Sequence, residues 1–125
     1  MTRRPATLLA LLTLIVASLG AMNAAADRAA TNKERGVIAK VVELPGKCAT
    51  VRVSTETQRP KWASVLWKPG PAACEPYARD GVAVVKRRHG RWRFVTAGSD
   101  FDCPRLYREV PRRIALDLDL DEWCH

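Results

Sequence analysis

Side chains that could serve as nucleophiles or proton carriers are few after residue 26. The serines are Ser54, Ser64 and Ser99, and the two histidines, His89 and His125, stand at a predicted turn and at the last position. Catalysis needs such groups held within hydrogen-bond reach of one another. The sequence has no G-x-S-x-G, H-E-x-x-H or glycine-rich phosphate loop that would arrange them. We therefore predict a protein that is not an enzyme and that carries no cofactor.

Two groups of closely spaced aspartates could form a carboxylate pair or a metal site. Asp100 and Asp102 flank one aromatic residue and could form a carboxylate pair, but such residues far more often cap the turn that follows. Asp117, Asp119 and Asp121 resemble a calcium loop in spacing, yet leucines separate them and the required glycine is missing. A solvated acidic face, or partial neutralisation of basic residues elsewhere in the chain, is the simpler interpretation. No metal site is predicted.

The best functional signal is a group of cations at the tip of a predicted β-hairpin. The stretch Asp80 to Cys103, DGVAVVKRRHGRWRFVTAGSDFDC, contains two β-type apolar runs joined at His89 and Gly90. A two-residue hairpin loop needs positive φ at both central residues, which glycine adopts freely and histidine tolerates. The predicted cross-strand pairs are Arg87/Trp92, Lys86/Arg93, Val85/Phe94, Val84/Val95 and Ala83/Thr96. One face of the hairpin then ends in the cations Lys86, Arg88, Arg91 and Arg93.

This arrangement sets like charges directly opposite each other, which normally destabilises a sheet. An anionic partner would relieve the repulsion, so the four cations are the predicted anion-binding site. The alternative is that surface cations only keep the protein soluble. The expected partners are an anionic cell-envelope polymer or an acidic protein. Nucleic acid is disfavoured, because the chain is predicted to be exported and shows no recognisable nucleic-acid-binding signature.

Four aromatic residues could be imagined as a stacking platform for sugars or bases: Trp62, Trp67, Trp92 and Phe94. Because half of them alternate into one face of the predicted sheet, most are expected in the core instead. Trp92 opposite Arg87 predicts a cation–π pair at the end of the strand.

The cysteines are Cys48, Cys74, Cys103 and Cys124, an even number that predicts two disulfides in an oxidising compartment. The preferred pairs are Cys103 with Cys124 and Cys48 with Cys74, and Cys74 with Cys103 is the alternative. Zinc binding ranks lower, because no C-x-x-C or H-x-x-x-H spacing is present.

Export is predicted from the first 26 residues. Arg3 and Arg4 precede an apolar run from Leu8 to Leu19, and Ala24-Ala25-Ala26 provides small residues for cleavage before Asp27. An uncleaved anchor is the alternative, but the run is short for a spanning helix, so no stable membrane span is expected after cleavage. Removing two arginines and no acid lowers the formal net charge from +8 to +6. The mature protein is thus predicted to be secreted and basic.

The elements expected to position these residues follow from periodicity and from breakers. Thr31 or Asn32 should cap a helix that ends near Leu44 with Val37, Ile38, Val41 and Leu44 on one face, although a strand over 37–44 remains an alternative. Residues 27–32 should be frayed. Alternation predicts strands over 49–56 and 62–67, proline and glycine predict a loop over 68–76, and Pro111 predicts the start of a short helix over 112–118. The final LDLDLDEW fits an extended segment equally well.

Together these elements predict one α+β domain over residues 27–125. Its expected core is a four-stranded antiparallel sheet with an N-terminal and a short C-terminal helix on one face. With 47% hydrophobic and 27% charged residues, the composition is that of an ordinary globular protein.

A resemblance supports this assignment. The segments VRVS, Trp62-Ala63, DGVAVVKRR, GRWRFVTAGS, Cys103 and VPRRIALDL are similar to small exported proteins of unknown function common in actinobacteria. The resemblance covers most of the mature chain and implies an extracellular α+β domain. It implies no activity.

The sequence therefore predicts a secreted domain that binds an anionic surface or polyanion through its hairpin tip. The alternative is a protein-binding module, such as a hydrolase inhibitor, that presents the proline-rich loops 58–62 or 68–76.

Overall fold

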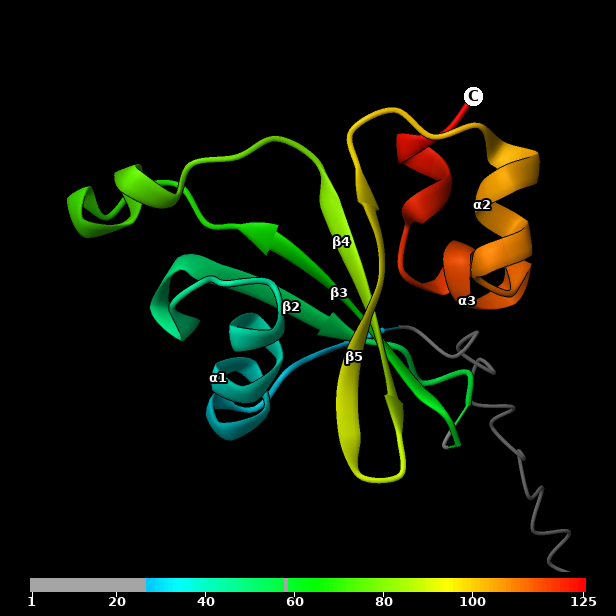
Figure 1. Ribbon diagram of the computed structural model, residues 1–125, viewed down its shortest axis with the longest axis horizontal. Coiled ribbons are helices and arrows are strands. Elements are labelled where there is room, and N and C mark those ends of the chain that lie inside the picture. The colour runs from blue at the N-terminus through cyan, green and yellow to red at the C-terminus, as the bar shows by residue number, and fades with distance from the viewer. Residues whose placement is uncertain (1–26, 58) are drawn as a thin grey trace, which may run out of the picture.

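The computed structural model describes residues 27–57 and 59–125, in which one antiparallel sheet is flanked by helices (Figure 1). The predicted leader lies outside the described residues. Five strands pair in chain order: β1 (Arg28–Ala29), β2 (Ala49–Val53), β3 (Lys61–Trp67), β4 (Val82–Arg88) and β5 (Arg91–Gly98). The α+β class is confirmed, whereas the expected four strands are one too few.

The additional strand is β1, which lies at the edge of the sheet beside β2. Arg28 pairs with Val53, and Ala29 pairs with Arg52. The guanidinium of Arg52 also donates to the carboxylate of Asp27 at 2.8 and 2.9 Å and to the Asp27 carbonyl at 2.9 Å. The start of the described chain is therefore fixed, and the expectation of a frayed segment over 27–32 is wrong.

Helices cover both faces of the sheet, so the expected placement on one face is also wrong (Figure 1). The flanking elements are α1 (Asn32–Val41), η1 (Gly46–Cys48), η2 (Ala72–Tyr77), α2 (Cys103–Glu109), α3 (Arg112–Asp117) and η3 (Leu120–Trp123). Ala63 and Val65 of β3 pack into the α1 core, whereas Trp62 packs into the core under α2 and α3. A strand that is apolar on both sides needs cover on both sides. Within the described ranges, no helix has the length and apolar character needed to cross a membrane.

Helix α1 begins where the sequence predicts. Thr31 and Glu34 form a capping box, in which the Glu34 amide donates to Thr31 Oγ1 at 3.2 Å and the Thr31 amide donates to Glu34 Oε1 at 3.1 Å. The helix ends at Val41, before the expected Leu44. There the amide of Glu43 donates to the Lys40 carbonyl and the amide of Leu44 donates to the Ala39 carbonyl. This pair of hydrogen bonds is a Schellman motif.

Of the predicted apolar face, Ile38 and Leu44 are buried and Val41 packs against the same core, but Val37 is not part of it. Ile38 and Ala39 are fully buried, whereas Val37, expected in the core, is 52% exposed.

The β4–β5 hairpin keeps the predicted register only near its tip. Val85 pairs with Phe94 as expected, but Val84 pairs with Thr96 and not with Val95. A β-bulge at this point inserts one extra residue into β5. The predicted pairs Val84/Val95 and Ala83/Thr96 are therefore wrong, and Val95 packs against the α2–α3 core.

The C-terminal segment is more helical than predicted. Helix α2 was not expected; Asp102 caps it by accepting a hydrogen bond from the Arg105 amide at 3.2 Å. Helix α3 follows Pro111, as predicted. The final LDLDLDEW continues through α3 into η3 with Leu120 buried, so the extended alternative is wrong.

Both preferred disulfides are confirmed. Cys48 bonds Cys74 and Cys103 bonds Cys124, which excludes the Cys74–Cys103 alternative and leaves no thiolate for zinc. The first disulfide links η1 to η2, and Trp67 Nε1 donates to the Cys74 carbonyl at 2.9 Å.

Candidate functional site

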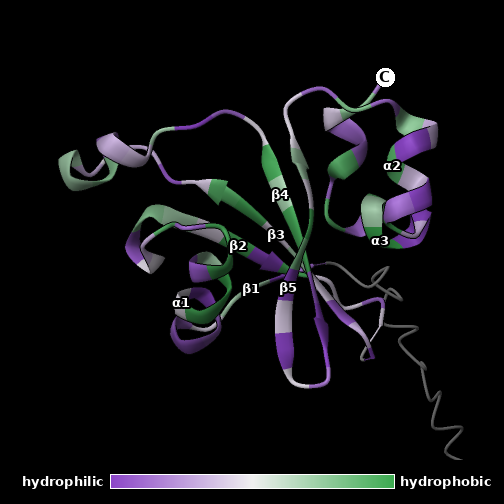
Figure 2. Cartoon of the chain, in the orientation of Figure 1, coloured by the Kyte–Doolittle hydropathy of each residue, from purple (hydrophilic) through white to green (hydrophobic). Residues whose placement is uncertain are grey.

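The four predicted cations come together at the free end of the β4–β5 hairpin. His89 and Gly90 form the turn, with φ angles of 50° and 76°, as the two-residue loop requires. Lys86 lies opposite Arg93, and Arg88 lies opposite Arg91. Directly opposed residues of antiparallel strands project from the same face. Figure 2 shows this end of the hairpin as hydrophilic, in contrast to the apolar strands between the helices.

Lys86 differs from the other three cations, because it is half-buried. Its ammonium lies 4.8 Å from the centre of the Trp62 ring, and Trp62 is its pairing neighbour on β3. Desolvation, followed by the nearby charge of Arg88, lowers the pKa of Lys86 from its ordinary value. Lys86 therefore contacts the core through Trp62, while the three arginines of the same face are exposed.

Three further cations, which were not predicted as part of the anion-binding site, surround the same tip. Arg59 lies in the β2–β3 connection, and Lys61, the first residue of β3, pairs with Arg87. A hollow of about 870 Å³ separates this connection from the hairpin turn; its lining residues are Arg59, Pro60, Lys61, Arg87, Arg88, His89 and Gly90. No carboxylate is among these lining residues. We use "basic tip" for Arg59, Lys61, Lys86, Arg87, Arg88, Arg91 and Arg93.

The ion pairs of the described residues lie away from the basic tip. Among residues 27–57 and 59–125, the ion pairs are Arg28–Glu34, Arg52–Asp27 and His125–Asp100. None of them involves the basic tip. Neutralisation of the tip by the acidic series of residues 117–121 is therefore not seen in the described part.

The pairing of β3 with β4 explains why Arg59, Lys61 and Arg87 were missed. The sequence indicates a turn over residues 58–60 and assigns Arg87 to the other face of the hairpin. Only the antiparallel register, which sets Trp62 opposite Lys86, brings the two segments side by side. That register is long-range information, and the apolar pattern of these strands does not specify it.

The aromatic residues are divided between core and surface. Trp62 is 4% exposed, as predicted for a core residue, but Phe94 is 55% exposed. Trp92 packs at the edge of the α1 core. Within the described chain, the cation–π contacts are Lys86–Trp62 and Arg112–Tyr107, so the predicted Arg87–Trp92 contact is wrong.

The proline-rich loop 68–76, the alternative contact surface, is exposed except at Cys74. Its disulfide and the Trp67 hydrogen bond hold the base of the loop, and η2 projects away from the sheet (Figure 1). In the other predicted loop, 58–62, Trp62 is buried.

The candidate catalytic residues are not brought together. Ser54 Oγ donates to Asp117 Oδ2 at 2.6 Å, which joins the end of β2 to α3. His125 pairs with Asp100 at 3.2 Å, and His89 is exposed at the turn. In the part of the chain that is described, no hydrogen bond joins a serine to a histidine. That the protein is not an enzyme stays a prediction.

Comparison of the chain with protein-family models, with curated proteins and with solved structures finds no match.

Proposed function

We propose that this is an exported domain that binds a polyanion through its basic tip. The observation that supports the proposal is the gathering of seven cations around one hairpin end, without an acidic partner among the described residues. Export rests on the predicted leader, and the two disulfides fit an oxidising compartment.

The geometry favours an extended anion over a single small one. Lys86, Arg88, Arg91 and Arg93 lie on one face of the hairpin, whereas Lys61 and Arg87 lie on the other. A chain of phosphates could contact both sides of the turn. Guanidinium groups suit phosphate because they donate two parallel hydrogen bonds. A phosphate-rich wall polymer is the partner that we propose.

The proposal can be tested with the double variant Arg91→Glu plus Arg93→Glu. Binding to long-chain inorganic polyphosphate and to isolated wall polymer would be measured at low and moderate salt. The matched control is Arg108→Glu plus Arg113→Glu, which changes the net charge equally at exposed positions of α2 and α3. The tip variant should bind at least about tenfold more weakly, a loss of roughly 1.4 kcal/mol.

Wild-type affinity should also fall as salt rises, because the screening length shortens to about 8 Å at physiological ionic strength. Equal losses in the tip variant and its control would show that net charge alone attracts the polymer. Unchanged binding by a folded tip variant would remove the basic tip as the functional surface.

The second candidate is a protein-binding module that uses loop 68–76. The exposed, disulfide-held loop supports it. A one-to-one complex that survives moderate salt and is lost when residues 69–71 are replaced by alanine would favour this function over the first.

A further inference from the structure

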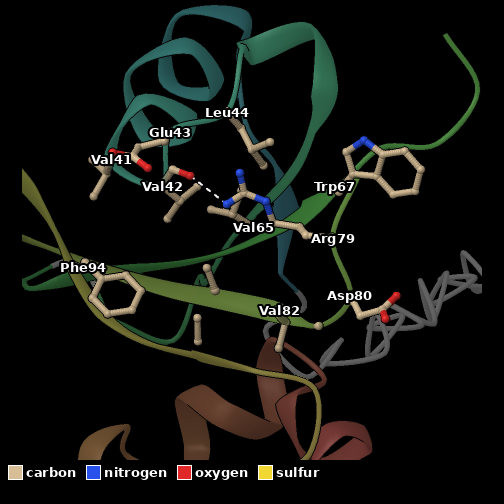
Figure 3. A pocket seen from close by; sticks show the side chains of 13 residues that line it. Val41, Val42, Glu43, Leu44, Val65, Trp67, Arg79, Asp80, Val82 and Phe94 are labelled. Carbon is tan, nitrogen blue, oxygen red and sulfur yellow. Dashed lines mark hydrogen bonds between the residues drawn. The ribbon is translucent and has the colours of Figure 1, made fainter. Parts of the chain in front are cut away.

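A separate pocket of about 270 Å³ lies between the end of α1 and the sheet (Figure 3). We call it the α1 pocket. Its apolar walls come from the end of α1, the turn that follows it, β3 and β5: Val41, Val42, Leu44, Val65, Trp67 and Phe94. It shares no lining residue with the hollow at the basic tip. The α1 pocket is therefore an independent feature of the fold.

The walls of this pocket are held in place before any ligand arrives. The Schellman ending fixes the turn after α1, where Glu43 has a φ of 59°. Arg79 reaches across from the β3–β4 connection, and its Nη1 donates to the Val42 carbonyl at 2.9 Å (Figure 3). The Cys48–Cys74 disulfide ties this connection to the segment after α1. Ligand pockets are usually preformed in this way.

Phe94 gives the pocket an incompletely covered apolar wall. It is 55% exposed, although aromatic side chains of this size are normally well buried. In Figure 3 its ring and Val41 bound the cavity on the side away from Trp67. An apolar group seated here would cover part of Phe94.

Arg79 supplies a fixed charge at the rim. Besides the bond to Val42, its Nε donates to the Tyr77 carbonyl at 3.4 Å. A guanidinium has five N–H donors, so most remain for a ligand. No carboxylate of the described residues lies within ion-pair distance of Arg79. Glu43 and Asp80 also line the pocket, and the carboxylate of Asp80 points away from the cavity in Figure 3.

We propose that the α1 pocket binds a carboxylate attached to an apolar group of about one ring, with the carboxylate on Arg79 and the apolar group against Phe94. Size supports a small ligand, because 270 Å³ equals the liquid volume of about nine waters. That is near the lower end of ligand pockets. A free organic acid and the C-terminal apolar residue of a peptide share this chemistry.

The test is a titration of the disulfide-bonded protein, followed by amide NMR shifts. The probes are phenylacetate, its amide phenylacetamide, its amine counterpart phenethylamine, and a short peptide ending in phenylalanine as the free acid or the amide. Phenylacetate should shift the backbone amide signals of Val41, Val65 and Phe94. Phenylacetamide, the peptide amide and phenethylamine should each bind at least about tenfold more weakly than the corresponding acid, since they cannot form the guanidinium–carboxylate pair. A peptide acid that binds more tightly than phenylacetate identifies a peptide terminus as the source; equal or weaker binding identifies a small acid.

Three variants distinguish ligand binding at the α1 pocket from the structural role of Arg79. Arg79→Met should lower phenylacetate affinity at least about tenfold, against no change in the control Arg108→Met. Because Arg79 also supports the end of α1, Phe94→Ser serves as a second variant; it should weaken binding in a protein whose amide spectrum is still that of the folded chain. Glu43→Gln should strengthen binding by removing a negative charge from the lining.

Three results would overturn the proposal: preference for phenethylamine, shifts confined to the basic tip, or full affinity in both the Arg79 and Phe94 variants. The basic-tip variant Arg91→Glu plus Arg93→Glu should bind phenylacetate normally, so failure at one site leaves the other standing.

Discussion

The ion pair between Arg28 and Glu34 should make the stability of the fold depend on pH in a defined acid range. Two guanidinium nitrogens of Arg28 donate to the two oxygens of Glu34 at 2.7 and 2.8 Å. The Thr31 amide donates to the same carboxylate. These hydrogen bonds, that of Arg28 above all, lower the pKa of Glu34 from 4.5 to about 2. One carboxylate thereby holds the first turn of α1 to strand β1.

The sign of the effect follows from linkage. A carboxyl group with a lower pKa in the folded chain stabilises the fold above its unfolded pKa, and this contribution is lost as the pH falls through the folded value. For Glu34 that range runs from 4.5 down to about 2. The whole shift corresponds to roughly 3 kcal/mol. Because the Arg28 side chain is 40% exposed, solvent screening reduces the expected contribution to about 0.5–1 kcal/mol.

The variant Glu34→Gln tests this reasoning, because it keeps a hydrogen-bond acceptor for the Thr31 amide and removes the charge. Urea unfolding near neutral pH should show a free energy of unfolding about 0.5–1 kcal/mol below wild type. The difference should shrink steadily as the pH falls below about 4. Glu56→Gln, at an exposed position, is the control and should stay close to wild type throughout. A difference that is constant over this pH range, or absent near neutrality, would refute the role given to the charge.

Two further predictions concern long-range connections. Replacing both cysteines of Cys48–Cys74, which are 26 residues apart, with alanine should lower the free energy of unfolding by about 3.5 kcal/mol in a denaturant titration. The same change at Cys103–Cys124, 21 residues apart, should lower it by about 3.3 kcal/mol. A loss under about 1 kcal/mol from either variant would contradict the chain-entropy argument. Asp117→Ala should cost about 2–3 kcal/mol, because it removes the acceptor for the Ser54 hydroxyl at 2.6 Å and for the next amide at 3.1 Å. In that background Ser54→Ala should cost less than it does alone; strict additivity in the cycle would show that the two side chains are not coupled.

Features set by neighbouring residues were predictable from the sequence. The helix start at Thr31, one of the two predicted caps, the turn at His89 and Gly90 and the start of α3 after Pro111 all appear where the pattern indicates. In each case the physical cause lies within about four residues, in a side-chain cap or a permitted φ angle. The disulfide pairs were also anticipated, from export and sequence proximity.

Features set by distant segments were not predictable. Strand β1 is two residues long, too short to show alternation, and exists because Arg52 and β2 hold it. The bulge in β5 was hidden because apolar residues occupy both faces there, so either register buries a similar surface. Three of the seven cations of the basic tip were missed because their grouping depends on the pairing of β3 with β4, which sets Lys61 opposite Arg87. The cations that share one face of the hairpin were therefore predicted from the sequence, and those that join the site only through the tertiary fold were not.

The repulsion within the basic tip separates a functional cluster from an accidental one. Arg88 faces Arg91 and Lys86 faces Arg93, and each such pair destabilises the sheet by about 0.2–1 kcal/mol. Arg91→Glu with Arg93→Glu turns both repulsions into attractions, so the free energy of unfolding should rise while polyphosphate binding falls. A variant that binds less because it is damaged would instead be less stable. A protein that keeps like charges together for a ligand should gain stability and lose binding when those charges are reversed. If the double variant loses both stability in a denaturant titration and affinity in the binding assay, the explanation that the like charges are kept for a ligand is refuted.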